Sequence, residues 1–118
     1  MTILYVENHA RFAEIAVKTF LTEHTITVVP SLVLARLALA QAPFDLILLD
    51  QDLDDGKGTA LAAELCRQSE RPKILAVSSH DAGNNALLAA GADWVCAKRD
   101  FKQITTIIAN LLKVLATG

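Results

Sequence analysis

The sequence predicts one α/β domain, in which helices wind around both faces of a five-stranded parallel sheet. The chain has 118 residues, which is the length of a single compact domain. Five short apolar runs alternate along it with longer segments of helical period, and no linker or repeat interrupts them. Strict alternation with right-handed crossovers places helices on both faces of one twisted sheet.

The strands are expected where apolar residues follow one another without polar alternation. Such runs are typical of strands that are covered on both faces, as in a parallel sheet. They are residues 3–6 (ILYV), 26–29 (ITVV), 46–49 (LILL), 74–77 (ILAV) and 94–97 (WVCA).

The helices are expected between these runs, where apolar residues recur at helical spacing. In the last segment Ile104, Ile108 and Leu115 lie on one face, and Ser31 can cap the second segment at its N-terminus. The five segments are 10–22, 32–41, 59–69, 84–90 and 101–116.

The composition excludes several classes of protein. Apolar residues make up 53% of the chain and charged residues 20%, which excludes a disordered segment. A net charge of −2 provides no broad basic field, so we expect no nucleic-acid binding by this domain. The N-terminus lacks the basic region of a signal peptide, and the most apolar stretch, 32–40, is too short to span a bilayer. We therefore expect a cytoplasmic protein without a membrane partner.

The two cysteines form no recognisable motif. Cys66 and Cys96 lie far apart in the sequence, with no CxxC and no paired Cys/His spacing. We interpret both as buried, reduced, structural thiols, as is usual in the cytosol.

Polar side chains follow four of the five predicted strands. The carboxyl ends of parallel strands meet at one edge of the sheet, where ligands bind near the switch in strand order. The groups are Glu7 and Asn8 after the first strand, Asp50 after the third, Ser78 ending the fourth and Lys98 after the fifth. Carboxylate and amide oxygens suit Mg²⁺, and an ammonium and a hydroxyl suit phosphoryl oxygens. The set is suited to the phosphorylation of a carboxylate.

These motifs, in this order, resemble the receiver domain of two-component response regulators over essentially the whole chain. The matching pieces are Glu7-Asn8, the hydrophobic run ending in Asp50, Gly58, Ser78 and the segment GADWVCAK that ends at Lys98. The resemblance implies a CheY-like, flavodoxin-like fold with strand order 2-1-3-4-5. It also implies that residues 1–118 form a single receiver domain.

The resemblance implies a role for each site residue. Asp50 would accept a phosphoryl group from a histidine kinase or phosphotransfer protein, and Lys98 and Ser78 would bind its oxygens. Glu7, Asn8, Asp50 and the backbone carbonyl of Asp52 would hold Mg²⁺. The domain would be regulatory and not an enzyme, apart from slow self-dephosphorylation.

The resemblance also implies a docking face for a downstream protein. It would comprise the fourth helix, fifth strand and fifth helix, including Asn84, Asn85, Trp94 and Lys102. Asp54 and Asp55, in contrast, are expected to be solvated turn residues.

The sequence departs from the family pattern at four positions. Asn8 replaces the second acid, so we expect weaker Mg²⁺ binding. Val95 stands at the aromatic switch position, three residues before Lys98, while Trp94 points to the opposite face. Arg99 and Asp54 each replace a proline.

Two alternative functions follow. The first is a pseudo-receiver, a protein-interaction module that no longer uses phosphate to switch. The second is an aspartate-nucleophile phosphatase resembling the haloacid dehalogenase group, with Asp52 as general acid and base. That group carries its motif after the first strand, and this chain has no room for its cap.

Overall fold

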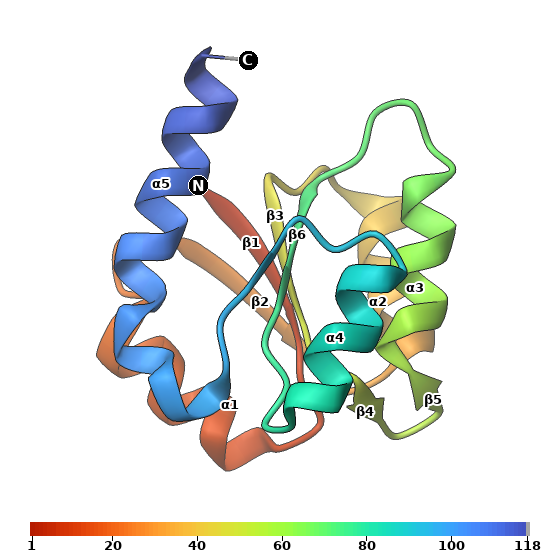
Figure 1. Ribbon diagram of the computed structural model, residues 1–118, viewed down its shortest axis with the longest axis horizontal. Helices are drawn as coiled ribbons and strands as arrows, with labels where there is room; N and C mark the ends of the chain where they lie inside the picture. The colour runs from red at the N-terminus through yellow and green to blue at the C-terminus, as the bar shows by residue number, and fades with distance from the viewer. Residues whose placement is uncertain (118) are drawn as a thin grey trace.

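A five-stranded parallel sheet forms the centre of the protein (Figure 1). The computed structural model describes residues 1–117, apart from the side chains of residues 112 and 114–117. The strand order β2-β1-β3-β6-β7 confirms the predicted order, because a separate small hairpin takes the labels β4 and β5. The sheet strands are β1 (Thr2–Val6), β2 (Thr25–Val29), β3 (Leu46–Leu49), β6 (Lys73–Ala76) and β7 (Trp94–Val95).

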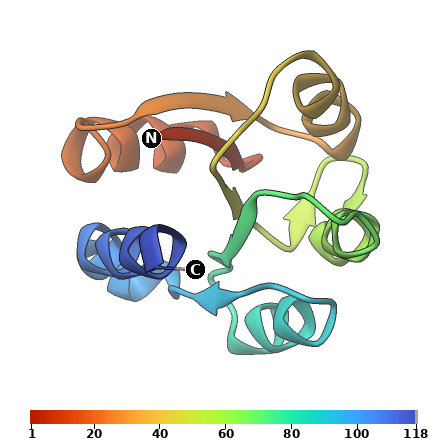
Figure 2. The same ribbon diagram turned by 90° about the horizontal axis from the view of Figure 1, so that it is seen from above.

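Helices cover both faces of this sheet, as the alternating pattern predicts (Figures 1 and 2). One layer contains α1 (Ala10–Phe20) and α5 (Ile104–Thr117), which follows a short 3₁₀ helix, η1 (Lys98–Gln103). The opposite layer contains α2 (Leu32–Gln41), α3 (Gly58–Cys66) and α4 (Asp81–Ala89). None of the helices in residues 1–117 has the length and apolarity to cross a membrane.

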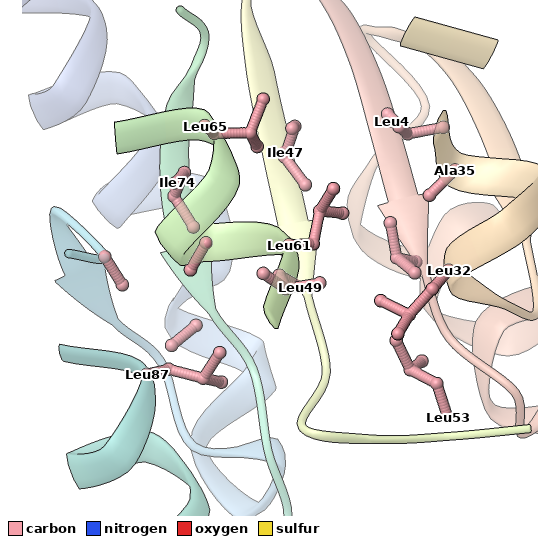
Figure 3. Packing of buried hydrophobic residues seen from close by; sticks show 14 of the residues in the cluster. Leu4, Leu32, Ala35, Ile47, Leu49, Leu53, Leu61, Leu65, Ile74 and Leu87 are labelled. Atoms are coloured by element: carbon pink, nitrogen blue, oxygen red, sulfur yellow. The ribbon is translucent and has the colours of Figure 1, made fainter. Parts of the chain in front are cut away.

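The three central strands contribute to two separate cores, which explains their uninterrupted apolar sequence. Alternate residues point to opposite faces, so that Leu4 packs toward α2–α4 while Ile3 and Tyr5 pack toward α1 and α5. Figure 3 shows the first core, in which strand residues meet leucines of α2, α3 and α4. Its labelled members are Leu4, Leu32, Ala35, Ile47, Leu49, Leu53, Leu61, Leu65, Ile74 and Leu87.

The second core contains an aromatic cluster centred on Phe101 of η1. The Phe101 ring stacks on Tyr5 at 6.2 Å and meets the edge of Phe12 at 5.4 Å between centroids. Ile104 and Ile108 extend this core along α5, as predicted, while the Leu115 side chain lies outside the described part. These contacts bind η1 to α1 and β1, and thereby fix the position of Lys98 at the start of η1.

Several boundaries differ from the prediction. β7 contains only Trp94 and Val95, because the chain turns into η1 directly after residues 96–97. β2 is not covered on both faces: it is an edge strand, and Val28 remains 43% exposed. α4 starts at Asp81, three residues earlier than predicted, and α3 ends at Cys66.

The expectation of two buried thiols is wrong for Cys66. Cys96 is buried in the second core, whereas Cys66 is exposed at the end of α3, beside Gly91. Helical periodicity did not predict the exposure of Cys66. The sequence predicts a helix that continues to residue 69, whereas α3 ends at Cys66 and the chain beyond it leaves the core.

The sequence did not predict the hairpin of β4 (Asp52–Leu53) and β5 (Gly56–Lys57). Asp55, at its turn, accepts hydrogen bonds from the Leu32 and Val33 backbone N–H groups at 2.7 and 3.0 Å. These bonds cap α2 together with the predicted cap Ser31, and they lower the pKa of Asp55. Asp55 is therefore a capping residue and not only a solvated turn residue, while Asp54 is exposed as expected.

Gly58 allows α3 to start directly against the chain at Asp50. A Cβ atom at Gly58 would collide with the Asp50 carbonyl oxygen and lie 3.2 Å from Cγ of Leu49.

We predict that Gly58→Ala lowers the free energy of unfolding by about 2 kcal/mol, because the backbone must shift. Urea denaturation measures this. The control Ala60→Gly, at an exposed position of α3, should cost about 1 kcal/mol, and an equal or smaller loss at Gly58 would contradict the contact.

Candidate functional site at the carboxyl edge of the sheet

Lys98 brings two buried carboxylates together at the carboxyl ends of the strands. Glu7 follows β1 and Asp50 follows the adjacent strand β3, and their exposed fractions are 1% and 5%. The Lys98 Nζ atom lies 2.5 Å from Oε1 of Glu7 and 3.2 Å from Oδ2 of Asp50. The structure thus joins three of the predicted site residues in one ion-pair cluster.

Asp50 is held by hydrogen bonds on both sides. Its backbone N–H donates to the Val6 carbonyl at 3.1 Å, and its Oδ1 accepts from the Gln51 N–H at 2.8 Å. The Gln51 carbonyl accepts from the Gly58 N–H, and the Gln51 side chain accepts from the Thr59 N–H. The segment after Asp50 is therefore attached to the first turn of α3.

Glu7 lies in a crowded, poorly solvated position. Burial raises the pKa of Glu7, and the nearby Asp50 carboxylate raises it further, against the opposing effects of Lys98 and the His9 N–H. The His9 N–H donates to Oε2 of Glu7 at 3.0 Å. Negative charge at this site is therefore costly without a compensating cation.

Tyr5 is a member of the site's surroundings that the sequence reading missed. It is fully buried, and burial, followed by the charges of Glu7 and Asp50, holds the pKa of its hydroxyl far above the usual value. It therefore remains protonated. Tyr5 lies in β1 and Glu7 directly follows this strand; their spacing of two residues, which the sequence shows, places both on one face.

Ser78 is buried two residues after β6, and its hydroxyl is hydrogen-bonded within the loop that enters α4. The Ser78 Oγ atom accepts a hydrogen bond from the His80 N–H at 3.2 Å. Its backbone N–H donates to Oδ1 of Asn84 at 2.8 Å. Ser78 is thus linked to α4, and its carbonyl also accepts a hydrogen bond from the backbone N–H of Lys98 at 3.3 Å.

The other two predicted metal ligands lie at the surface. Asn8 is exposed, and so is Asp52, whose carboxylate forms an ion pair with Lys57 across the hairpin. The oxygens of Glu7, Asp50 and Asn8 are chemically suited to Mg²⁺. Within residues 1–117, no group of three or more His, Cys, Asp or Glu residues gathers as a metal site. The donor types therefore fit Mg²⁺, with only two carboxylates to balance its charge.

The predicted docking face contains a groove of about 510 Å³ between α4, β7 and the η1–α5 segment. Asn85 and Val95 line it, and the Arg99 guanidinium at its margin pairs with Asp81 at 2.9 Å. Trp94 is 50% exposed, as expected. Asn84 is a correction: it is 3% exposed, because its side chain turns inward to Ser78.

A comparison with protein families identifies the chain. The sequence model described as "Response regulator receiver domain" matches residues 3–109. The chain belongs to this family. No curated protein matches the sequence significantly.

Solved structures of receiver domains share the fold at low sequence identity. The Francisella response regulator 1452 receiver domain superposes with a TM-score of 0.85 at 19% identity, covering 97% of this chain and 98% of that one. Thermotoga maritima TrrA, solved in complex with Mg²⁺ and BeF, superposes with a TM-score of 0.82 at 20% identity, covering 93% of this chain and 97% of that one. A Burkholderia pseudomallei response regulator with a phosphorylated aspartic acid, calcium ion and citrate superposes with a TM-score of 0.77 at 22% identity. The match covers 98% of this chain and 71% of that one.

The raised pKa of Glu7 predicts a specific pH dependence of stability. A carboxyl whose pKa is raised by folding stabilises the folded protein fully below its unfolded value of 4.5, and this contribution is lost as the pH rises through the folded pKa. Glu7→Gln should therefore be more stable than the wild type at neutral pH, and the difference should shrink toward zero at acidic pH. Urea denaturation across this range measures it.

Glu14→Gln is the matched control for this experiment. The hydrogen bond that Lys18 donates to Glu14 lowers the pKa of Glu14. Glu14→Gln should therefore be less stable than the wild type at neutral pH, the opposite direction from Glu7→Gln. A Glu7→Gln protein less stable than wild type at neutral pH would contradict the raised pKa of this buried carboxyl.

Proposed function

We propose that residues 1–118 act as one receiver domain that accepts a phosphoryl group on Asp50 and thereby changes its binding to a downstream protein. One observation carries this: a buried aspartate at the carboxyl edge of the sheet contacts Lys98 beside a second buried carboxylate. Family membership supports it, since phosphorylation-dependent switching is the general function of receiver domains. The domain is regulatory in this proposal, with at most slow self-dephosphorylation.

The proposed transfer is a substitution at phosphorus. A carboxylate oxygen of Asp50 attacks the phosphohistidine of a kinase or phosphotransfer protein, the new O–P bond forms, and the P–N bond to the imidazole breaks. Asp50 is a weak nucleophile, so positioning and neutralisation of charge carry the reaction. Lys98 is placed to neutralise the phosphoryl oxygens, and removing such a donor typically costs about 3 kcal/mol.

Mg²⁺ is the proposed cofactor. When bound, it would supply positive charge to the phosphoryl oxygens. Glu7, Asn8, Asp50 and the backbone carbonyl of Asp52 would hold it. Asn8 contributes an uncharged oxygen, which reduces the attraction for the ion.

We further propose that the domain acts in the cytoplasm and binds its downstream partner at the groove between α4, β7 and α5. The groove combines exposed polar groups, such as Asn85, with the apolar Val95 and Leu88. No part of this proposal involves nucleic acid or a membrane.

The pseudo-receiver is the second candidate. The observation that favours it is the hydroxyl of Ser78, which is already engaged by His80, next to a β7 strand without an aromatic ring at Val95. The phosphatase alternative has less support, because the Asp52 carboxylate pairs with Lys57 and not with the Asp50 cluster.

Phosphorylation by acetyl phosphate tests the proposal. With Mg²⁺ present, we expect intact-protein mass spectrometry to show one added phosphoryl group in the wild type and none in Asp50→Asn. Lys98→Ala should slow the reaction by about 100-fold. Asp52→Asn is the control and should still be phosphorylated, because its carboxylate faces Lys57. An unmodified wild-type protein, unchanged in its amide spectrum by beryllofluoride, would leave the pseudo-receiver as the function.

The effect of Asn8 on the metal can be measured separately. Asn8→Asp adds a charge beside Glu7 and should raise the affinity for Mg²⁺ by about tenfold. Calorimetric titration of the unphosphorylated protein measures it. Asn85→Asp adds the same charge on the exposed face of α4 and should leave the affinity unchanged. Equal effects of the two substitutions would contradict a metal site at Asn8.

A further inference from the structure

Asn84 of α4 holds the backbone of Ser78 with both ends of its side-chain amide. Its Oδ1 accepts from the Ser78 N–H at 2.8 Å, and its Nδ2 donates to the Ser78 carbonyl at 3.2 Å. Both residues are buried, at 3% and 1% exposure. A buried amide is stable only when its polar atoms are paired, and here the backbone N–H and carbonyl of a single residue, Ser78, pair both ends.

The side chain of Ser78 is also in contact with the first turn of α4. A Cβ atom at Gly83 would lie 2.5 Å from the Ser78 Oγ atom and 3.1 Å from its Cβ, so only glycine lets the helix approach this closely. The hydroxyl accepts from the His80 N–H, directly before α4. The backbone and the side chain of Ser78 are therefore both held against the N-terminal end of α4.

The same helix borders the groove. Asn84 lines it together with Asn85, Leu88 and Val95 of β7. The Val95 side chain carries no polar atom and therefore cannot follow the Ser78 hydroxyl by hydrogen bonding. α4 therefore touches both Ser78 and the groove.

We infer that Asn84 is a positioning residue that makes α4 move with Ser78, so that a phosphoryl group on Asp50 is reported at the groove through the Asn84 amide. The inference rests on the proposed function. A phosphoryl group adds about two negative charges and strong acceptor oxygens, which favour a donated hydrogen bond from the Ser78 hydroxyl. When Ser78 moves toward it, the paired amide carries α4 along, because separating them would leave buried polar groups without partners.

Beryllofluoride with Mg²⁺ tests this, with amide NMR spectra of each protein recorded with and without it. In the wild type we expect changes near Asp50, at Gln51 and Gly58, and also in α4, at Leu88 and Ala89. In Asn84→Ala the changes at Gln51 and Gly58 should persist, while those in α4 fall by about threefold or more. Ala82→Ser, at an exposed position of the same helix outside the groove, should behave like the wild type.

Binding strength separates coupling from a merely structural role. If Asn84 couples α4 to Ser78, then in Asn84→Ala the movement of Ser78 no longer has to displace the helix. Asn84→Ala should therefore bind beryllofluoride as tightly as the wild type or more tightly. A merely structural residue would on removal weaken binding and reduce the changes everywhere. Ser78→Ala should abolish the α4 response, and adding Asn84→Ala to it should have no further effect.

A second variant covers the case in which Asn84→Ala does not fold. Asn84→Asp keeps the oxygen that accepts from the Ser78 N–H and loses the donor to its carbonyl, so a reduced α4 response with an intact response at Gln51 is expected. Unchanged α4 responses in the Asn84 variants would overturn the inference alone. A wild-type protein without changes at Gln51 and Gly58 would overturn the proposed function and the inference together.

Discussion

The ion-pair cluster of Lys98 with Glu7 and Asp50 is the interaction on which the rest of the site depends. Two carboxylates this deeply buried cost several kcal/mol unless a cation compensates them. Lys98 can do so only because β1 and β3 end, and η1 starts, at the same edge of the sheet. Its ammonium also lies 5.0 Å from the Phe12 ring centre, and Phe12 packs on Phe101, so the aromatic cluster holds the lysine in place.

The Ser78 peptide connects this cluster to the groove. Its carbonyl accepts hydrogen bonds from the backbone N–H of Lys98 at 3.3 Å and from the Asn84 side chain at 3.2 Å. One carbonyl group is therefore shared by the segment that carries the cation and the helix that borders the groove. A rearrangement at either side changes the surroundings of the other, which is the physical requirement for a switch.

Much of the architecture was predictable because burial on both faces leaves a strong pattern. The runs at 46–49 and 74–77 could be located within a residue, since central parallel strands contain almost only apolar residues. The prediction located β2 within a residue but missed its exposure, made β7 too long and did not include the β4–β5 hairpin. Their lengths and exposure depend on neighbouring elements and on hydrogen bonds such as that from Leu32 to Asp55, which join distant segments.

The sequence by itself determined the strand–helix alternation, the family, and the set of polar residues at the carboxyl ends of the strands. Those follow from periodicity and from residue order. Only the tertiary structure decided which partners these residues take: that Lys98 contacts both Glu7 and Asp50, that Asp52 pairs with Lys57, and that Asn84 is buried against Ser78. The physical reason is that periodicity fixes the face on which a side chain lies, whereas its partner depends on how separate elements pack together.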